Sequence, residues 1–230
     1  MSSRKYIPLL LTLLTLTGAC IAQTWDAKRD FAASNPNGAW AYGSGVTGSS
    51  FALDMTYLTQ CDAFGDTPGY VCWSGDLEYY LPVVGTNTTG HWLYCCHSLL
   101  LPPDVLVMHP APDWEAADSI VQWTAPVAAT YRISGYFEIL DAVAPTGVIV
   151  MVYRNGTLLV QAELLGPPAQ PPEQIGGRVN FYFPQVSFNA GDVISFGVNA
   201  DGTFYYDSTG FNATIVTPAN APPCTTCSQH

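Results

Sequence analysis

Short runs of alternating apolar and polar residues constrain this chain more than any other feature. The clearest run covers 130–139, TYRISGYFEI, and its odd-numbered positions hold Tyr131, Ile133, Gly135, Phe137 and Ile139. Alternation with a period of two is the pattern of a β-strand that buries one face. We find no convincing amphipathic helix beyond the N-terminal segment.

The same pattern recurs between turns that are rich in Gly, Pro and Asn. Asn155-Gly156 is a strong type I′ turn signal, because both central positions need a positive φ, so 148–164 should form a hairpin. Further strands are predicted at 29–33, 39–43, 51–58, 76–84, 105–109, 178–188 (with Pro184 as a break or bulge), 193–199 and 211–216. The fold class is therefore all-β, an antiparallel β-sandwich or jelly roll.

The first 22 residues indicate a secretory signal peptide. Arg4 and Lys5 precede an apolar stretch at 6–16 that is too short to span a bilayer, and cleavage is expected after Ala22. A lipoprotein signal that uses Cys20 is a minor alternative. No later run is long enough for a membrane span, so we expect an extracellular protein that is soluble after cleavage.

Cysteine usage fits an oxidising compartment. Of the seven cysteines, one lies in the signal, and the remaining even number favours disulfides: Cys61, Cys72, Cys95, Cys96, Cys224 and Cys227. We expect Cys61 to pair with Cys72, or each of them with one of Cys95 and Cys96. We expect Cys224 to pair with Cys227, and the alternative is a disulfide-linked oligomer assembled through the Cys-rich insert and this CxxC tail.

These features divide the chain into one domain with two appendages. Residues 23–217 should form a single β-sandwich, within which 58–103 is a disulfide-bearing insert or set of loops. Residues 218–230 form a Pro- and Cys-rich tail. Candidate N-glycosylation sites lie at Asn87, Asn155 and Asn212, and they apply only if the host is a eukaryote.

The charge balance excludes one class of partner. The chain carries 18 acidic and 7 basic residues, a net charge of −11. Without a basic stripe to neutralise phosphates, binding to nucleic acid or to an anionic membrane surface is not expected.

Several motifs together resemble a known module. They are WDAKRDFAASNPNGAWAYG at 25–43, VIVMVYRNG at 148–156, FNAGDVISFGVN at 188–199 and YYDSTGFNATI at 205–215. The set resembles an extracellular β-sandwich module of bacterial proteins with PEP-CTERM sorting tails and of other secreted microbial proteins. The resemblance implies a jelly roll of carbohydrate-binding-module type with no established catalytic activity. The chain departs from it in its cysteine-bearing insert and in lacking the terminal sorting helix.

Two metal sites can be drawn from the sequence. His91, Cys95, Cys96 and His97 contain zinc-type ligands, but an export pathway oxidises thiols and favours disulfides there. Asp30 near the first strand and Asp207 near the last could hold a structural calcium ion through oxygen ligands. Apart from that calcium, no cofactor is predicted.

Catalysis has little support in the sequence. The carboxylates that could hydrolyse glycosides in pairs are Asp113, Glu115, Asp118, Asp201 and Asp207, and nothing in the sequence fixes a separation between any two of them. Surface turns are the simpler interpretation. No nucleophile elbow and no zinc-protease motif occurs, so no catalytic residue is assigned.

Aromatic residues beside turns are the remaining candidates for binding. Trp40 and Trp123 are expected in the core, with Tyr42 on the same face as Trp40. In 203–208, TFYYDS, the period-two rule puts Phe204 and Tyr206 on one face and Tyr205 on the other. Sugar binding needs an exposed ring with polar neighbours, and three loop aromatics are candidates: Tyr205, Trp92 and Trp114.

The expected function follows from these observations. A secreted, non-catalytic module for glycans or extracellular matrix material comes first. A cell-surface structural or interaction protein assembled through disulfides is the alternative, and a carbohydrate-active hydrolase is third.

Overall fold

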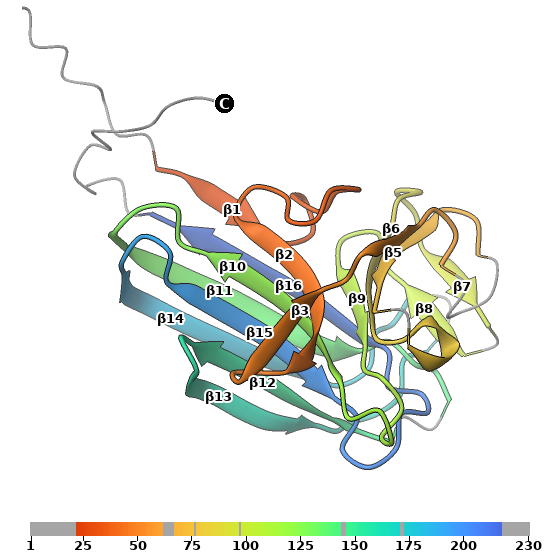
Figure 1. The fold of residues 1–230 in the computed structure, drawn as a ribbon. Coiled ribbons are helices and arrows are strands. Elements are labelled where there is room, and N and C mark those ends of the chain that lie inside the picture. The colour runs from red at the N-terminus through yellow and green to blue at the C-terminus, as the bar shows by residue number, and fades with distance from the viewer. Residues whose placement is uncertain are drawn as a thin grey trace, which may run out of the picture.

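Two antiparallel β-sheets pack face to face and enclose the core between them (Figure 1). The structure is a computed structural model that describes residues 22–61, 67–75, 77–96, 98–143, 146–170 and 173–217. The predicted signal peptide before Ala22 and the tail at 218–230 lie outside the described residues, as do Cys20, Cys224, Cys227 and His97. No described helix is long and apolar enough to cross a membrane.

The first sheet has eight strands. In spatial order they are β14 (Arg178–Phe188), β11 (Ala129–Ile139), β16 (Thr209–Val216), β9 (Leu106–His109), β6 (Val83–Asn87), β5 (Tyr70–Ser74) and β4 (Thr56–Leu58), with β1 (Thr24–Asp26) also paired to β16. The second has six: β13 (Thr157–Leu164), β12 (Val148–Arg154), β15 (Val193–Asn199), β10 (Asp118–Thr124), β2 (Trp40–Val46) and β3 (Ser50–Leu53). A separate hairpin joins β7 (Leu93–Cys95) to β8 (Leu99–Leu101). The fold is the predicted antiparallel β-sandwich.

The alternation in the sequence corresponds to buried and exposed faces. In β11, Tyr131, Ile133 and Phe137 are fully buried while Arg132 is exposed. In β16, Phe211, Ala213 and Ile215 are buried, as their spacing predicts. Asn155 and Gly156 both have positive φ in the predicted β12–β13 hairpin. A register shift opposite Tyr131 and Ile133 confirms a bulge at Pro184.

Three strand predictions are wrong, each where the chain turns. Residues 29–33 form no strand, because Asp26 and Asp30 close a turn there after β1. Residues 51–58 split into β3 and β4, which belong to different sheets and are separated by the buried Asp54. Only the end of 76–84 is a strand, since Glu78–Tyr80 form a 3-10 turn before β6.

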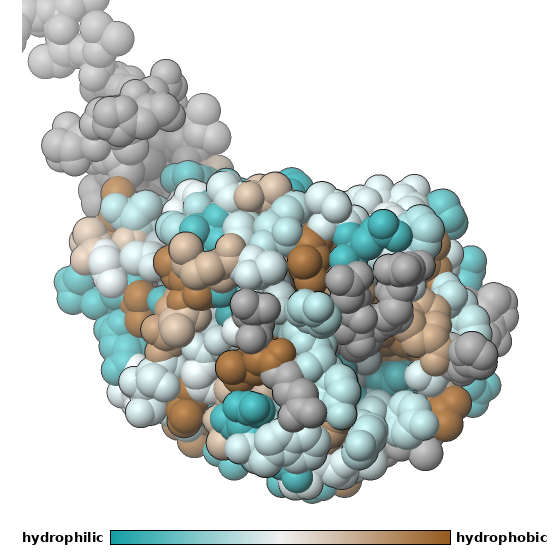
Figure 2. All heavy atoms as spheres, turned by 45° about the vertical axis from the view of Figure 1, so that its right-hand side comes forward, coloured by the Kyte–Doolittle hydropathy of each residue, from teal (hydrophilic) through white to brown (hydrophobic). Residues whose placement is uncertain are grey.

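Aromatic rings fill the core between the sheets. Trp123 lies within 5.3 Å of Trp25 and 5.0 Å of Tyr131, centroid to centroid, and both contacts are edge-to-face. Trp40 and Tyr42 are buried together, as predicted. On the face in Figure 2, apolar side chains form separated patches among polar ones.

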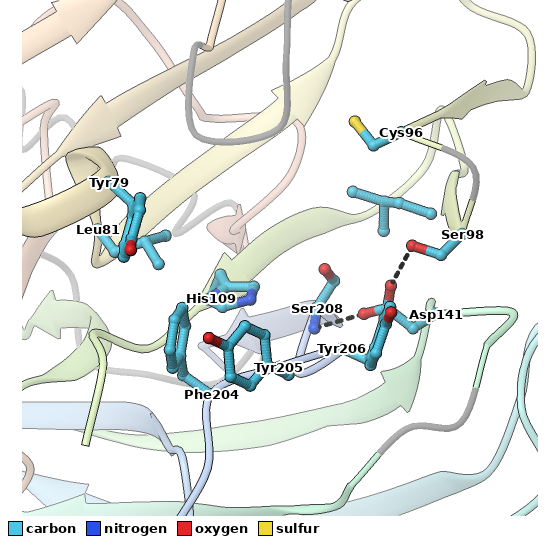
Figure 3. Close-up of a pocket in the computed structure, with 11 residues that line it drawn as sticks. Tyr79, Leu81, Cys96, Ser98, His109, Asp141, Phe204, Tyr205, Tyr206 and Ser208 are labelled. Atoms are coloured by element: carbon cyan, nitrogen blue, oxygen red, sulfur yellow. Dashed lines mark hydrogen bonds between the residues drawn. The ribbon is translucent and has the colours of Figure 1, made fainter.

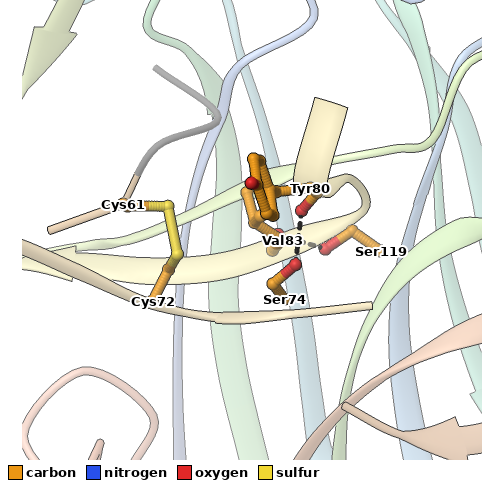
Figure 4. The surroundings of a disulfide bond; sticks show 6 residues. All are labelled: Cys61, Cys72, Ser74, Tyr80, Val83 and Ser119. Atoms are coloured by element: carbon orange, nitrogen blue, oxygen red, sulfur yellow. Dashed lines mark hydrogen bonds between the residues drawn. A yellow bond between two sulfur atoms is a disulfide. The ribbon is translucent and has the colours of Figure 1, made fainter. Parts of the chain in front are cut away.

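The cysteine-bearing segment at 58–103 extends the first sheet. Strands β5 and β6 continue the sheet beyond β9, and a second, smaller core forms behind them: Cys61, Tyr70, Cys72, Leu81, Val83, Cys95, Leu99, Leu101, Val107, Leu140, Ala200 and Phe204. The Ser119 hydroxyl donates to the Val83 carbonyl at 2.7 Å, and the Ser74 hydroxyl to the Tyr80 carbonyl at 2.6 Å (Figure 4). The bond to Tyr80 holds the 3-10 turn that carries Tyr79, and the bond to Val83 holds the start of β6 after it.

Both described disulfides lie in this segment. The first of the two predicted pairings is confirmed, because Cys61 bonds Cys72 (Figure 4). Cys95 bonds its direct neighbour Cys96, with their Cα atoms 3.7 Å apart, so the alternative in which these two cysteines pair with Cys61 and Cys72 is wrong. These four cysteines pair within the chain, so a disulfide-linked oligomer would depend on Cys224 and Cys227.

The two disulfides should contribute to stability very differently. Removing Cys61–Cys72 with a Cys61→Ala/Cys72→Ala variant should cost about 3 kcal/mol, because this bond closes a loop across a sequence separation of 11. The Cys95–Cys96 bond joins direct neighbours and closes no loop of chain. A Cys95→Ala/Cys96→Ala variant should therefore have nearly the wild-type free energy of unfolding in urea. Amide hydrogen exchange at Ser98–Leu101 should nevertheless accelerate. Equal losses of stability in the two variants would contradict this account.

Candidate functional site

A pocket of about 310 Å³ opens where the second core meets one end of the sandwich (Figure 3). Five separate parts of the chain contribute its walls: the 3-10 turn, the β7–β8 turn, the end of β9, the end of β11, and the loop between β15 and β16. Its lining residues are Tyr79, Leu81, Cys96, Ser98, Leu99, His109, Asp141, Phe204, Tyr205, Tyr206 and Ser208. This volume is at the lower end of the range for small-molecule sites, about 300–1,000 Å³.

Aromatic rings gather around Phe204. The Phe204 ring is buried and lies 4.4 Å from Tyr205 and 5.9 Å from Tyr79, the latter nearly parallel to it. Trp114 packs edge-on to it at 5.4 Å. Because Phe204 is held in the second core, it supports outer rings that remain accessible, with Tyr205 59% and Tyr79 55% exposed.

The backbone under three of these lining residues is in the left-handed region. Tyr79, Cys96 and Tyr206 have φ values of 60°, 59° and 63°. This conformation costs an L-residue other than glycine about 1 kcal/mol or more, and such residues cluster at functional sites. The turn at Tyr206 also ends the alternation expected for 203–208, so Tyr206 lines the pocket beside Tyr205 and does not share a face with Phe204.

Asp141 joins three of the segments that form the pocket. One carboxylate oxygen accepts from the Ser98 hydroxyl at 3.2 Å and the other from the Ser208 backbone N–H at 2.8 Å (Figure 3). Its backbone forms an isolated β-bridge with Leu99. Burial raises the pKa of Asp141 to about 6, so this carboxyl group is mainly ionised at neutral pH.

His109 forms a neutral part of the wall. Its Nδ1 lies 2.8 Å from the Pro110 carbonyl oxygen, which can only accept, so Nδ1 carries the proton. Burial lowers the pKa of His109 to about 4. The imidazole is therefore uncharged at neutral pH.

The Cys95–Cys96 disulfide forms another part of the wall. Cys95 is buried in the second core, whereas Cys96 is exposed and lines the pocket. The pairing consumes both thiols, so the zinc-type interpretation of 91–97 loses its two sulfur ligands.

The three aromatic residues predicted to bind sugar lie in different places relative to the pocket. Tyr205 lines the pocket, and Trp114 contacts the Phe204 ring at its edge. Trp92 is half-buried before β7 and is not among the lining residues. Of the three rings, Tyr205 and Trp114 therefore lie on the same cluster, because both contact the Phe204 ring.

The predicted calcium pair is wrong. Asp30 accepts bonds from the Asp26 N–H and the Trp40 indole, near the end of β16 where Asp26 pairs with Thr214. Asp207 precedes the other end of β16, and five residues of strand, about 17 Å, separate Thr209 from Thr214. The two carboxylates cannot share an ion.

Among the candidate glycosylation sites, Asn87 is also wrong for the folded protein. Its side chain is buried, and its amide nitrogen donates to the carbonyls of His91 and Leu101, both at 2.7 Å. A glycan on that nitrogen would replace one of its two protons, and so would break one of these bonds, at a side chain that is buried. Asn155 is exposed and Asn212 is partly exposed, and glycosylation of these two stays a prediction.

The carboxylates considered for hydrolysis do not meet in the pocket. Asp118 is buried and accepts from the Thr47 N–H and hydroxyl and from the Asn199 amide, which is a structural role. Asp113, Glu115 and Asp201 are exposed in turns. Of the described residues that line the pocket, Asp141 alone carries a carboxyl group.

Sequence reasoning missed most of the polar wall. Asp141 lies two residues after the strand predicted at 130–139, and strand-end loops often carry binding residues, so its position was an available signal. Tyr79 was assigned to a strand, and nothing local places Ser98, His109 or Ser208 near Tyr205. Only the fold brings these residues together.

Comparisons with known proteins add little. No family model matches the sequence, and a search of curated proteins finds no match. Among solved structures, a family 35 carbohydrate binding module from an environmental isolate is 17% identical and matches over 47% of this chain and 71% of that one, with a TM-score of 0.29.

Two further structures are similarly distant. A family 35 module from Clostridium thermocellum is 8% identical over 55% of this chain and 81% of that one, with a TM-score of 0.30. The catalytic domain of a GH87 alpha-1,3-glucanase in complex with nigerose is 12% identical over 90% of this chain and 30% of that one, with a TM-score of 0.33. Similarities this low carry no argument about function, and the PEP-CTERM resemblance stays a prediction.

Asp207, next to the pocket, should make stability depend on pH. Its side chain is buried and accepts from the Thr146 hydroxyl at 2.8 Å. Burial, with a smaller contribution from nearby carboxylates, raises the pKa of Asp207 to about 8. A carboxyl group with a raised folded-state pKa binds more protons when folded, so stability falls as the pH rises towards that value.

We therefore expect the melting temperature to fall as the pH rises from about 6.5 to 8. Below this window, the lowered pKa of His109 makes stability rise with pH, which would mask the effect of Asp207. Across this pH window, Asp207→Asn should remove about 1–2 kcal/mol of the fall in unfolding free energy. Part of the slope should persist, because burial also raises the pKa of Asp54 to about 7. Glu163→Gln, on the exposed side of β13, is the control, and identical slopes in all three proteins would refute the assignment.

Proposed function

We propose that this protein is a secreted, non-catalytic binding module whose pocket takes a glycan. The observation that carries the proposal is the pairing of exposed rings, Tyr205 and Tyr79, with buried polar groups in one hollow. The export signal and the internal disulfides support an extracellular role.

A sugar matches both kinds of wall. The C–H face of a pyranose is apolar and packs on an aromatic ring, while its hydroxyls need fixed hydrogen-bond partners. The pocket supplies Ser98, Asp141 and Ser208 within reach of the rings. Because these polar groups are already hydrogen-bonded to one another, they need little reorganisation on binding.

The size and composition of the pocket favour binding over hydrolysis. Its volume of about 310 Å³ suits a short segment or a chain end better than a long polymer. Glycoside hydrolysis generally uses two carboxyl groups across the scissile bond, and the described lining residues supply one. A module that retains its ligand without cleaving it fits these features.

Tyr205→Ala tests the proposal against a matched control. A glycan array first identifies a ligand, and isothermal titration then measures its affinity for the variants. We expect Tyr205→Ala to weaken binding by about 5- to 150-fold, which corresponds to the 1–3 kcal/mol typical of a ring that stacks on its ligand. Tyr182→Ala should bind normally, because Tyr182 is equally exposed, at 62% against 59%, but lies on β14 away from the pocket.

Both variants should melt near the wild-type temperature, because each ring is more than half exposed. Binding that Tyr205→Ala leaves intact would refute the pocket as the site. A protein that binds no glycan on the array would leave the proposed function without support.

A further inference from the structure

The pocket lies in a part of the surface without basic side chains. Of the described residues, the lysine and arginine side chains are all outside its lining: Lys28, Arg29, Arg132, Arg154 and Arg178. Most have partners elsewhere, since Arg29 pairs with Asp30, Arg154 with Asp192 and Arg178 with Glu138. The Lys28 ammonium group lies 3.4 Å from the Asn87 carbonyl.

Acidic groups surround the same pocket. Asp141 lies in its wall, and the carboxylates of Asp113, Asp201 and Asp141 are close enough to Asp207 to oppose its ionisation. His109, the remaining titratable nitrogen in the lining, is neutral. The field inside the pocket is therefore negative, and none of the described lining residues carries a positive charge at neutral pH to balance it.

The aromatic walls act in the same direction. The face of an aromatic ring attracts a cation through its quadrupole, and the described lining contains Tyr79, Phe204, Tyr205 and Tyr206. Rings together with a carboxylate form the arrangement that binds organic ammonium groups. A neutral sugar would use the rings but would leave the negative field uncompensated.

We propose that the pocket is selective for a glycan residue that carries a protonated amine, with the Asp141 carboxylate accepting from the ammonium group. This inference rests on the proposed function and names the class of sugar. A carboxylate offers about four acceptor positions; the Ser98 hydroxyl and the Ser208 N–H use two of them, and the Ser208 hydroxyl also interacts with this carboxylate. A remaining position can accept from an ammonium group without breaking these bonds.

Three hexasaccharides that share the β-1,4 linkage and differ at carbon 2 test this selectivity. They are the oligomers of glucosamine, of N-acetylglucosamine and of glucose, which present an ammonium, an acetamide and a hydroxyl group. We expect isothermal titration at low ionic strength to give an affinity about 10-fold higher for the glucosamine oligomer. This preference should shrink as salt is added, because salt screens charge attraction.

Asp141→Asn should abolish the preference, so that this variant binds the glucosamine and glucose oligomers with about equal affinity. Asparagine is nearly isosteric, and it can accept from the Ser208 N–H through its oxygen while its nitrogen donates to the Ser98 hydroxyl. Glu163→Gln removes the same unit of charge from exposed β13, so its preference should match wild type. The salt dependence of the wild-type protein is independent of how either variant folds.

The outcomes separate the two proposals. Equal affinities for the three oligomers, or a preference that Asp141→Asn retains, would overturn the charge selectivity while glycan binding stands. Binding of neutral glycans alone would do the same. If no glycan binds at all, the proposed function itself fails.

Discussion

The pocket depends on the hydrogen bonds of one buried carboxylate. Asp141 follows strand β11 and accepts from Ser98 in the β7–β8 turn and from Ser208 in the loop before β16. An uncompensated buried carboxylate would be costly, so these bonds hold all three segments in place. The same group gives the pocket its charge. One interaction therefore links the packing of the sandwich to the chemistry of its candidate site.

The fold has two hydrophobic cores, and each one stabilises a different part of it. The main core between the sheets holds the large aromatic rings and fixes β11 and β16. The second core, behind β5 and β6, supports the pocket from beneath through Leu81, Leu99 and Phe204. Because Phe204 is buried there, the rings of Tyr205 and Tyr79 can remain exposed without collapsing inwards. The strained backbone at Tyr79, Cys96 and Tyr206 is held by this support.

The sheets could be predicted from the sequence, and the pocket largely could not. The apolar positions of β11 and β16 are buried as the period-two rule predicts, because alternation is local to each strand. Glu138 departs from the rule: it is buried, with its carboxylate paired to Arg178. Tyr205 could also be predicted to line a binding surface, because an aromatic residue beside turn residues is likewise a local signal. Tyr206 was misplaced because its left-handed φ breaks the alternation. The convergence of Tyr79, Cys96 and Asp141 depends on pairings distant in sequence, which no local pattern encodes.

The central claim is that a sugar binds between the exposed rings and the buried polar wall. A crystal structure of the protein with a bound oligosaccharide tests it most directly. The account predicts a sugar ring packed on Tyr205 with a polar group hydrogen-bonded to the Asp141 carboxylate. A sugar bound instead on the outer face of the first sheet, in the hollow beside Tyr136 and Asn180, with the pocket unoccupied, would contradict it.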